Sequence, residues 1–143
     1  MYDSELDGRL PAVERVVAVE INGTYSAYPF SLLNDVGVAN EIVSGDPIVV
    51  FWKSGTTSPL SPSALDVGSS AVFLRTLGDQ TLTFRALGDE FEDLETGSRW
   101  NLFGEAISGP LTGQNLPQLI SAEHFWFAWA AFRPDTIVWS PAP

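Results

Sequence analysis

The sequence predicts a mainly β protein, on the border between the all-β and α+β classes, and three observations lead to that prediction. Short segments rich in β-branched and aromatic residues recur along the chain. Asn-Gly and Gly-Asp turn signals separate several of them. One late segment has the length and composition of a helix. We therefore expect a single compact β-sheet or barrel-like domain of short antiparallel strands with one C-terminal helix.

Length and composition indicate one folded domain after a short arm. Residues 1–12 are polar and acidic, and we interpret them as an N-terminal arm or linker. Residues 13–143 then form a single β-rich domain, which is long enough to bury a core without disulfides. Hydrophobic residues make up 45% of the chain, close to the globular average, which argues against disorder.

A hairpin is predicted at the start of this domain. Val13 to Ile21 is β-branched and partly alternating, which is typical of a strand. Asn22-Gly23 follows, and both residues tolerate the positive φ of a type I′ turn. Thr24 to Tyr28 is therefore the returning strand, and Pro29 ends it.

A second pair of strands is predicted after a short helix over residues 30–36. Val38 to Val43 and Pro47 to Trp52 lie on either side of a Ser-Gly-Asp turn. The second of these strands is almost entirely apolar, so we expect both of its faces to be buried. Lys53 to Gly68 is dominated by Gly, Ser, Thr and Pro, which predicts a long irregular loop of the kind that often carries function.

The second half of the chain is predicted to hold further strands and the main helix. The strands cover Ala71–Arg75, Thr81–Leu87, Trp100–Ile107 and Thr136–Trp139. The first two form a hairpin. Ser121 to Phe132 is the predicted helix, with Ser121 as its N-cap. The acidic run over residues 88–95 fails the EF-hand pattern, because Leu94 occupies the glycine position, and a charged edge or turn is expected there instead.

Charge and composition exclude several function classes. The net charge of −11 repels phosphate backbones, so no nucleic-acid partner is expected. The absence of cysteine excludes disulfides and thiolate chemistry. The longest apolar run, Phe125 to Phe132, is far shorter than the ~20 residues that span a bilayer, so no transmembrane segment is expected. The first seven residues lack the basic and apolar regions of a signal peptide.

An ordered series of motifs resembles one protein family. The segment from Glu95 to Leu111 (ETGSRWNLFGEAISGPL) is similar to the central motif of the DUF3179 family, which is bacterial and archaeal and has no known function. Residues 17–23 with 27–29, 40–50, 81–84, 126, 129 and 134–136 resemble the family's other motifs. The resemblance covers about residues 16–140. It adds an expectation of an extracytoplasmic location, in the periplasm or at the cell surface, because members commonly carry an export or anchor segment.

The resemblance also shows what this chain lacks. Many members have a Cys-Pro-x-Cys-like motif after the strand that ends near Trp52, whereas this chain reads Phe-Trp-Lys-Ser-Gly-Thr-Thr over residues 51–57. A histidine common in the family corresponds to about Val36. The thiol chemistry that such a pair would support is therefore not implied here.

No catalytic or metal site is predicted, and no cofactor. His124 is the one histidine, and it is expected to lie in the helix, partly covered by aromatic rings. The predicted binding residues are Trp52, Lys53, Ser54, Thr56, Thr57 and Trp126. They combine aromatic faces, which fill partner pockets or stack on sugars, with hydroxyl groups of the 53–68 loop. The alternative is that this loop is only a connection. Trp100 and Trp129 are expected in the core.

Two functional hypotheses follow. The first is a non-catalytic binding or assembly module, an extracytoplasmic subunit or accessory of a larger complex, whose partner is a protein or a membrane complex. The alternative is a carboxylate-dependent enzyme, such as a hydrolase that acts on carbohydrate.

Overall fold

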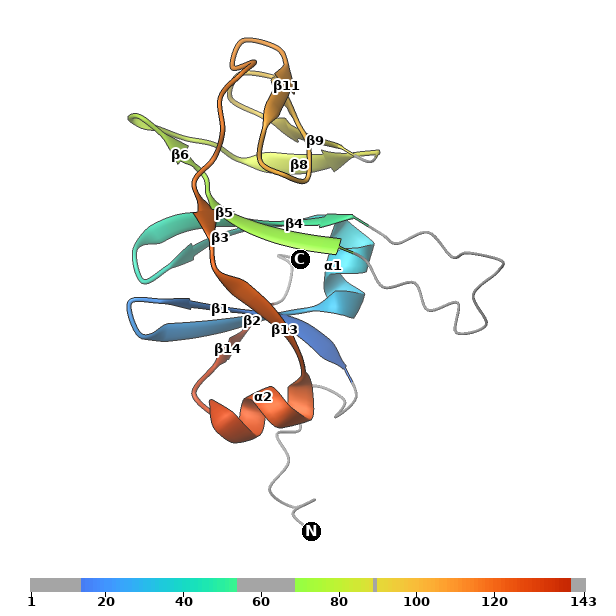
Figure 1. Ribbon diagram of the computed structural model, residues 1–143, viewed down its shortest axis with the longest axis vertical. Helices are drawn as coiled ribbons and strands as arrows, with labels where there is room; N and C mark the ends of the chain where they lie inside the picture. Colours follow the sequence, from blue (N-terminus) through green and yellow to red (C-terminus); the bar gives the residue numbers. More distant parts are fainter. Residues whose placement is uncertain (1–13, 54–68, 89, 140–143) are drawn as a thin grey trace, which may run out of the picture.

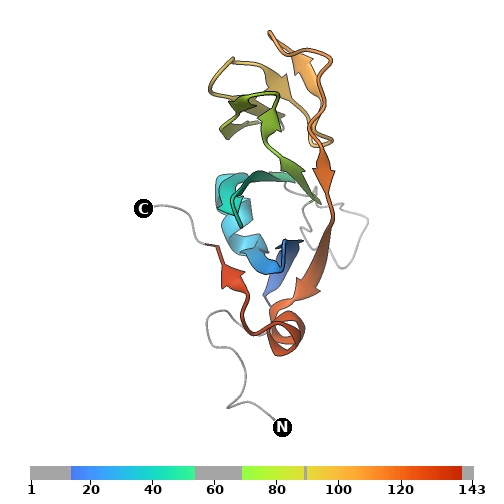
Figure 2. The same cartoon turned by 90° about the vertical axis from the view of Figure 1, so that its left-hand side faces the viewer.

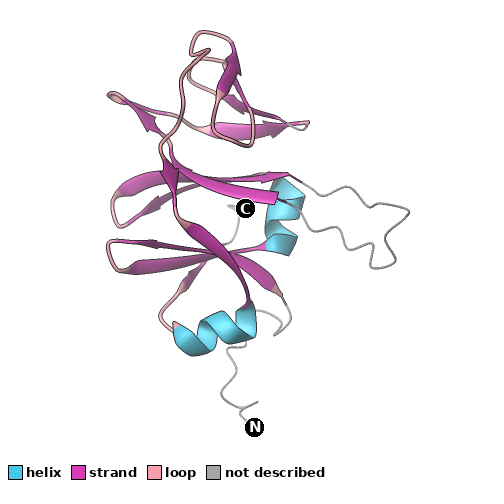
Figure 3. Cartoon of the chain, viewed as in Figure 1, coloured by secondary structure: helices cyan, strands magenta, loops and turns pink. Residues whose placement is uncertain are grey.

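Stacked β-sheets make up most of the structure, a computed structural model that describes residues 14–53, 69–88 and 90–139. Within these ranges the strands form three open four-stranded sheets and one small hairpin. The sheets lie one above another, with helix α2 (Trp126–Phe132) below the lowest sheet in Figure 1. Figure 3 shows how little of the chain is helical. The predicted mainly β class is confirmed.

The lower sheet joins the two ends of the described chain. Its strands, in spatial order, are β13 (Ser121–Phe125), β1 (Arg15–Ile21), β2 (Thr24–Pro29) and β14 (Ile137–Val138). The predicted hairpin is confirmed, since Asn22 and Gly23 have φ of 51° and 83°, the left-handed values of a type I′ turn. β14 runs parallel to β2, whereas β13 is antiparallel to β1.

The middle sheet contains the apolar strand that the sequence predicts to be buried on both faces. Its strands, in spatial order, are β12 (Gln118–Leu119), β5 (Ser69–Leu74), β4 (Asp46–Lys53) and β3 (Val38–Val43). Along β4, Ile48, Val50 and Trp52 belong to the core below the sheet. Val49 and Phe51 belong to the core above it. The alternation explains why almost every position of this strand is apolar.

The upper sheet is built from the shortest segments. Its strands, in spatial order, are β11 (Ala106–Ser108), β10 (Arg99–Trp100), β9 (Glu90–Asp93) and β8 (Phe84–Leu87). The small hairpin pairs β6 (Thr76–Leu77) with β7 (Gln80–Thr81). The predicted strand over 100–107 is interrupted, because the Asn101 Oδ1 accepts hydrogen bonds from the backbone N–H groups of Phe103 and Glu105 and so closes a turn.

The hairpin predicted between residues 71–75 and 81–87 does not form. β5 pairs with β4 and β12, while the turn after Leu77 joins β6 to β7. The chain leaves the middle sheet at buried Arg75, whose guanidinium donates to the carbonyl oxygens of Ile48 (2.8 Å), Leu82 (2.9 Å) and Glu41 (3.2 Å). This side chain fixes the direction in which the next strand continues.

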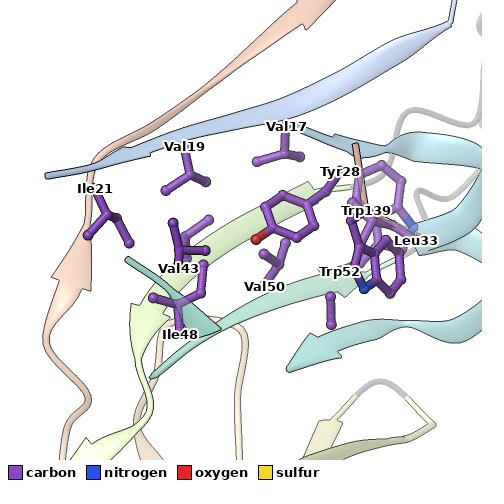
Figure 4. Packing of buried hydrophobic residues seen from close by; sticks show 12 residues of the cluster. Val17, Val19, Ile21, Tyr28, Leu33, Val43, Ile48, Val50, Trp52 and Trp139 are labelled. Carbon is purple, nitrogen blue, oxygen red and sulfur yellow. The ribbon is translucent and has the colours of Figure 1, made fainter. Parts of the chain in front are cut away.

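Three hydrophobic clusters fill the spaces between the layers. The first lies between the lower and middle sheets, where Figure 4 shows Tyr28 between Val17 and Val50. The second lies between the middle and upper sheets and contains a stacked pair of rings, Phe51 and Phe91, with centroids 4.1 Å apart. The third packs α2 against the lower sheet. A small helix, α1 (Phe30–Val36), closes the side of the first cluster, as the sequence predicts.

The predicted helix over 121–132 is shorter in the structure. Residues 121–125 form strand β13, which pairs with β1 from Val19↔Ser121 to Arg15↔Phe125, and the helix begins at Trp126. Ser121 is therefore not the N-cap. Without β13, the backbone N–H and C=O groups along the edge of β1 would lack partners. Pairing these groups outweighs the local preference of residues 121–125 for a helix. Figure 2 shows how the segment from β12 to β13 runs along one side, joining the middle sheet to the lower one.

The central motif is built around a buried carboxylate. Asp93 is fully buried, and its Oδ2 accepts a hydrogen bond of 2.8 Å from the Trp100 indole N–H. Its Oδ1 accepts from the Thr96 backbone N–H at 2.6 Å. The Ser98 Oγ accepts from the Leu111 N–H at 2.9 Å and thereby joins both ends of the motif. The expectation that Trp100 lies in the core is confirmed, and the motif is explained by these structural contacts.

The burial of Tyr28 should make the protein less stable at alkaline pH. Burial raises the pKa of this phenol well above its usual range, and the carboxylate of Glu41 adds to the effect. Because the folded-state pKa exceeds the unfolded value of about 10, the stabilisation is complete below that pH and is lost as pH rises above it. We expect the unfolding free energy of Tyr28→Phe to fall less than that of the wild type between about pH 9 and 11. Equal slopes for Tyr28→Phe and the wild type would contradict the prediction.

Candidate functional site

One hollow of the described surface lies where the sequence predicts a site. It has a volume of about 220 Å³. Its lining residues come from the end of α1, the end of β4 and the end of β8, and they are Asn34, Asp35, Val36, Gly37, Trp52, Lys53, Ala86 and Gly88. Trp52 and Lys53 thus lie together here, whereas Ser54, Thr56 and Thr57 lie outside the described residues.

Trp52 is held rigidly at this hollow. Its ring packs on Phe30 with a centroid distance of 4.7 Å, and its indole N–H donates to the Asn34 Oδ1 at 3.3 Å. Only 5% of the surface of Trp52 is exposed, so little of its ring is open to a ligand. The backbone N–H of Trp52 donates to the carbonyl of Gly37, which ties β4 to the end of α1.

The same hollow brings together the two positions at which the resemblance implies lost chemistry. The resemblance places the family's histidine at about Val36, and Lys53 is the last residue of β4, next to the segment where the resemblance places the cysteine motif. Both line the hollow. In this chain the functional groups at that place are the Asn34 amide, the Asp35 carboxylate and the Lys53 ammonium.

The second hollow, which we call the aromatic hollow, lies between the lower sheet and α2. It has a volume of about 330 Å³. Its lining residues are Ala18, Glu20, Tyr25, Ile120, Ser121, Ala122, His124, Trp129, Phe132 and Arg133. This hollow is not among the sites predicted from the sequence. The hairpin register implied by the Asn-Gly turn was a usable signal, since it places Glu20 opposite Tyr25.

Ring contacts organise the aromatic hollow. His124 stacks on Trp129 with centroids 4.9 Å apart, and Tyr25 meets Trp129 edge-on at 6.1 Å. The Arg133 guanidinium lies 4.5 Å from the ring centroids of both Tyr25 and Phe132. His124 is therefore covered by an aromatic ring, as expected, but it lies in β13 and not in the helix. The expectation that Trp129 lies in the core is wrong, since it is half-buried at the hollow, where it donates to the Thr136 hydroxyl at 2.8 Å.

The helix beside this hollow exposes an apolar surface. We define the α2 surface as the exposed residues at the end of β13 and along α2, which are Phe125, Phe127, Ala128, Ala131 and Phe132. Exposure is 48% for Phe125, 39% for Phe127 and 66% for Phe132. Trp126, one of the predicted binding residues, points the other way and is fully buried against Val16 and Ala27.

Two classes of site are absent from the part of the chain that the structure describes. No group of three His, Asp or Glu side chains in that part lies close enough together to hold a metal ion. No helix formed by the described residues has the length and hydropathy needed to cross a membrane.

The fold and surface define a layered, mainly β domain with two hollows and an exposed aromatic helix. The chain belongs to the family described as Protein of unknown function (DUF3179), whose model matches residues 1–136. Comparison with curated proteins and with solved structures finds no match. The resemblance inferred from the motifs is thus confirmed.

Proposed function

We propose that this protein is a non-catalytic binding module that docks a partner protein on the α2 surface. The supporting observation is the composition of α2, whose sequence WFAWAAF contains no charged or hydrogen-bonding residue except the tryptophan indoles. A helix that is apolar on every face is normally buried. Here only Trp126 and Ala130 are buried, and the phenylalanines remain accessible. Clustered exposed aromatic residues are the usual anchors of protein interfaces.

Charge points to the chemistry of the partner. Glu14 and exposed Asp135 flank the two ends of α2, because the Trp126 N–H donates to the Glu14 carbonyl and Asp135 follows the helix. The whole chain carries a net charge of −11. The partner surface that fits is therefore apolar at its centre and basic at its rim, which favours fast association at low salt. The family resemblance adds the proposal that the complex is extracytoplasmic.

A photo-cross-linking experiment in the source cell tests this function. A benzoyl-phenylalanine placed at Phe127 should give an adduct with one partner protein, in the extracytoplasmic fraction. The matched control is Phe103, which is 75% exposed but lies in the turn before β11, at the other end of the molecule (Figure 1). A cross-linker at Phe103 should give no adduct with that partner.

Affinity measured with the purified partner then tests the role of the helix. Phe127→Ser and Phe132→Ser should each weaken binding at least about tenfold, because truncated interface anchors commonly cost 1–2 kcal/mol or more. Phe103→Ser should leave binding unchanged. The proposal would be overturned if the cross-linker at Phe127 gave adducts with residues 1–13 of the same chain or with a second copy of it. An adduct found in the cytosolic fraction would overturn the proposed extracytoplasmic location.

A further inference from the structure

The aromatic hollow lies beside the α2 surface and shares Phe132 with it, but it has chemistry of its own. We propose that it binds a small ligand that combines one carboxylate with a flat apolar ring, and that Arg133 is the residue that binds the carboxylate. This inference goes beyond the docking of a protein on the α2 surface, and it does not depend on it.

Arg133 differs from every other described arginine. Arg15, Arg85 and Arg99 form salt bridges with Glu123, Glu92 and Glu90. Arg75 donates to three backbone carbonyl oxygens. The Arg133 side chain has no hydrogen-bond acceptor or carboxylate partner among the described residues, and its Nε is buried. In a chain with 18 carboxylates and seven cations, an unpaired and half-buried guanidinium requires an explanation.

The surroundings hold this guanidinium ready for an anion. Tyr25 and Phe132 contact it through their ring faces, an attraction that uses none of its N–H donors. The planar fork of those donors matches a carboxylate, which arginine binds through two parallel hydrogen bonds. The Ser121 hydroxyl and the His124 imidazole line the same hollow and supply further polar groups.

The walls and the charge select the rest of the ligand. Trp129 and Phe132 offer ring faces and edges against which a flat apolar group packs. The volume of about 330 Å³ lies at the small end of ligand pockets. Glu20 also lines the hollow and adds a negative charge to it, so a ligand with a single negative charge fits better than a phosphate with two.

Three probes that share one ring test the proposal on the full chain. Indole-3-acetate carries the carboxylate, 3-methylindole lacks it, and tryptamine replaces it with a cation. Titrations followed by two-dimensional NMR of the N–H groups should show saturable binding of indole-3-acetate. The shifts should centre on the Trp129 indole N–H, which Trp129→Phe assigns among the five tryptophan signals. The other two probes should bind at least about tenfold more weakly, the loss expected for a charged hydrogen-bonded pair.

Variants with opposite effects on affinity distinguish specific binding from nonspecific hydrophobic adsorption. Arg133→Gln should weaken indole-3-acetate binding about tenfold and should leave 3-methylindole unchanged. Glu20→Gln should tighten indole-3-acetate binding a few-fold, since it removes a repelling charge. Phe127→Ser, which changes the α2 surface outside the hollow, should have no effect, so the failure of one proposal is distinguishable from the failure of the other.

Three results would overturn the inference. The first is the absence of saturable indole-3-acetate binding. The second is equal affinity for indole-3-acetate and 3-methylindole, which needs no variant to measure. The third is a preference for tryptamine, which would make Glu20 the recognition residue in place of Arg133.

Discussion

Asp93→Ala should lower the unfolding free energy by about 3 kcal/mol or more, one of the two largest effects we expect from a single change. The Trp100 indole N–H and the Thr96 backbone N–H both donate to this carboxylate and would lose their acceptor. Trp100 is fully buried, so no water replaces the lost partner of its indole. Urea unfolding followed by near-ultraviolet circular dichroism measures the change, because the signal reports the packing of buried tryptophans.

Two variants show whether the effect belongs to the buried network. Asp93→Asn keeps the size and one acceptor oxygen, and it should cost about half as much as the alanine variant. Glu90→Ala removes a carboxylate that is two-fifths exposed and pairs with Arg99 at 3.2 Å. This variant should change the unfolding free energy by less than about 1 kcal/mol. If Asp93→Ala were no more destabilising than Glu90→Ala, the carboxylate would not organise the motif.

Gly109→Ala should destabilise the protein by about 3–5 kcal/mol, because two penalties coincide at this residue. Its φ of +93° strains any residue with a Cβ, which costs about 1–2 kcal/mol. An added Cβ would also lie 2.6 Å from the Ser98 Cα, a backbone atom that cannot rotate away. Displacing Ser98 weakens its hydrogen bond with Leu111 and the backbone bond between the Asp93 N–H and the Ser98 carbonyl.

The chain contains a matched control for this substitution. Gly113 has the same φ of +93°, and an added Cβ there would meet nothing within 4 Å. Gly113→Ala should therefore cost only the backbone strain, about 1–2 kcal/mol. The difference between the two variants measures the steric contact alone. Equal losses in urea unfolding would show that Ser98 moves freely and that the close approach has no energetic weight.

Local signals predicted those elements that local chemistry determines. The Asn-Gly turn specified the first hairpin and its register, and the apolar run of β4 indicated burial on both faces. The helix over 30–36 was likewise predicted with its bounds. Each of these features depends on neighbours in sequence or on the residue composition of one strand, so the pattern alone was sufficient.

Elements determined by distant contacts could not be predicted in the same way. Residues 121–125 have no strand signal stronger than their helical one, and they become β13 because the edge of β1 is available. The hairpin over 71–87 fails because Arg75 reaches carbonyl oxygens on β4 and β3 and a third, that of Leu82, in the segment between β7 and β8. A single buried side chain and a free sheet edge are both invisible until the sheets are assembled.

The same difference between local and distant contacts separates the two candidate sites. The hollow at Trp52 and Lys53 lies at the end of a buried strand, a position that the sequence analysis selected. Ser54, Thr56 and Thr57 of that predicted site lie outside the described residues, so their part stays a prediction. The aromatic hollow combines β1, β2, β13 and α2, and its key residue, Arg133, follows a helix whose extent was predicted too long.

The lower sheet has a consequence for synthesis on the ribosome. The β1–β2 hairpin is made before the other described strands, but both of its neighbours, β13 and β14, come from residues 121–138. Pairings between such distant segments form slowly, because the entropy cost of closing a long loop comes before any stabilising contact is made. A nascent chain therefore leaves the outer edges of β1 and β2 unpaired until residues 121–138 have been synthesised. The α2 surface and the aromatic hollow appear only at that moment, so a truncated product presents neither to a partner or ligand.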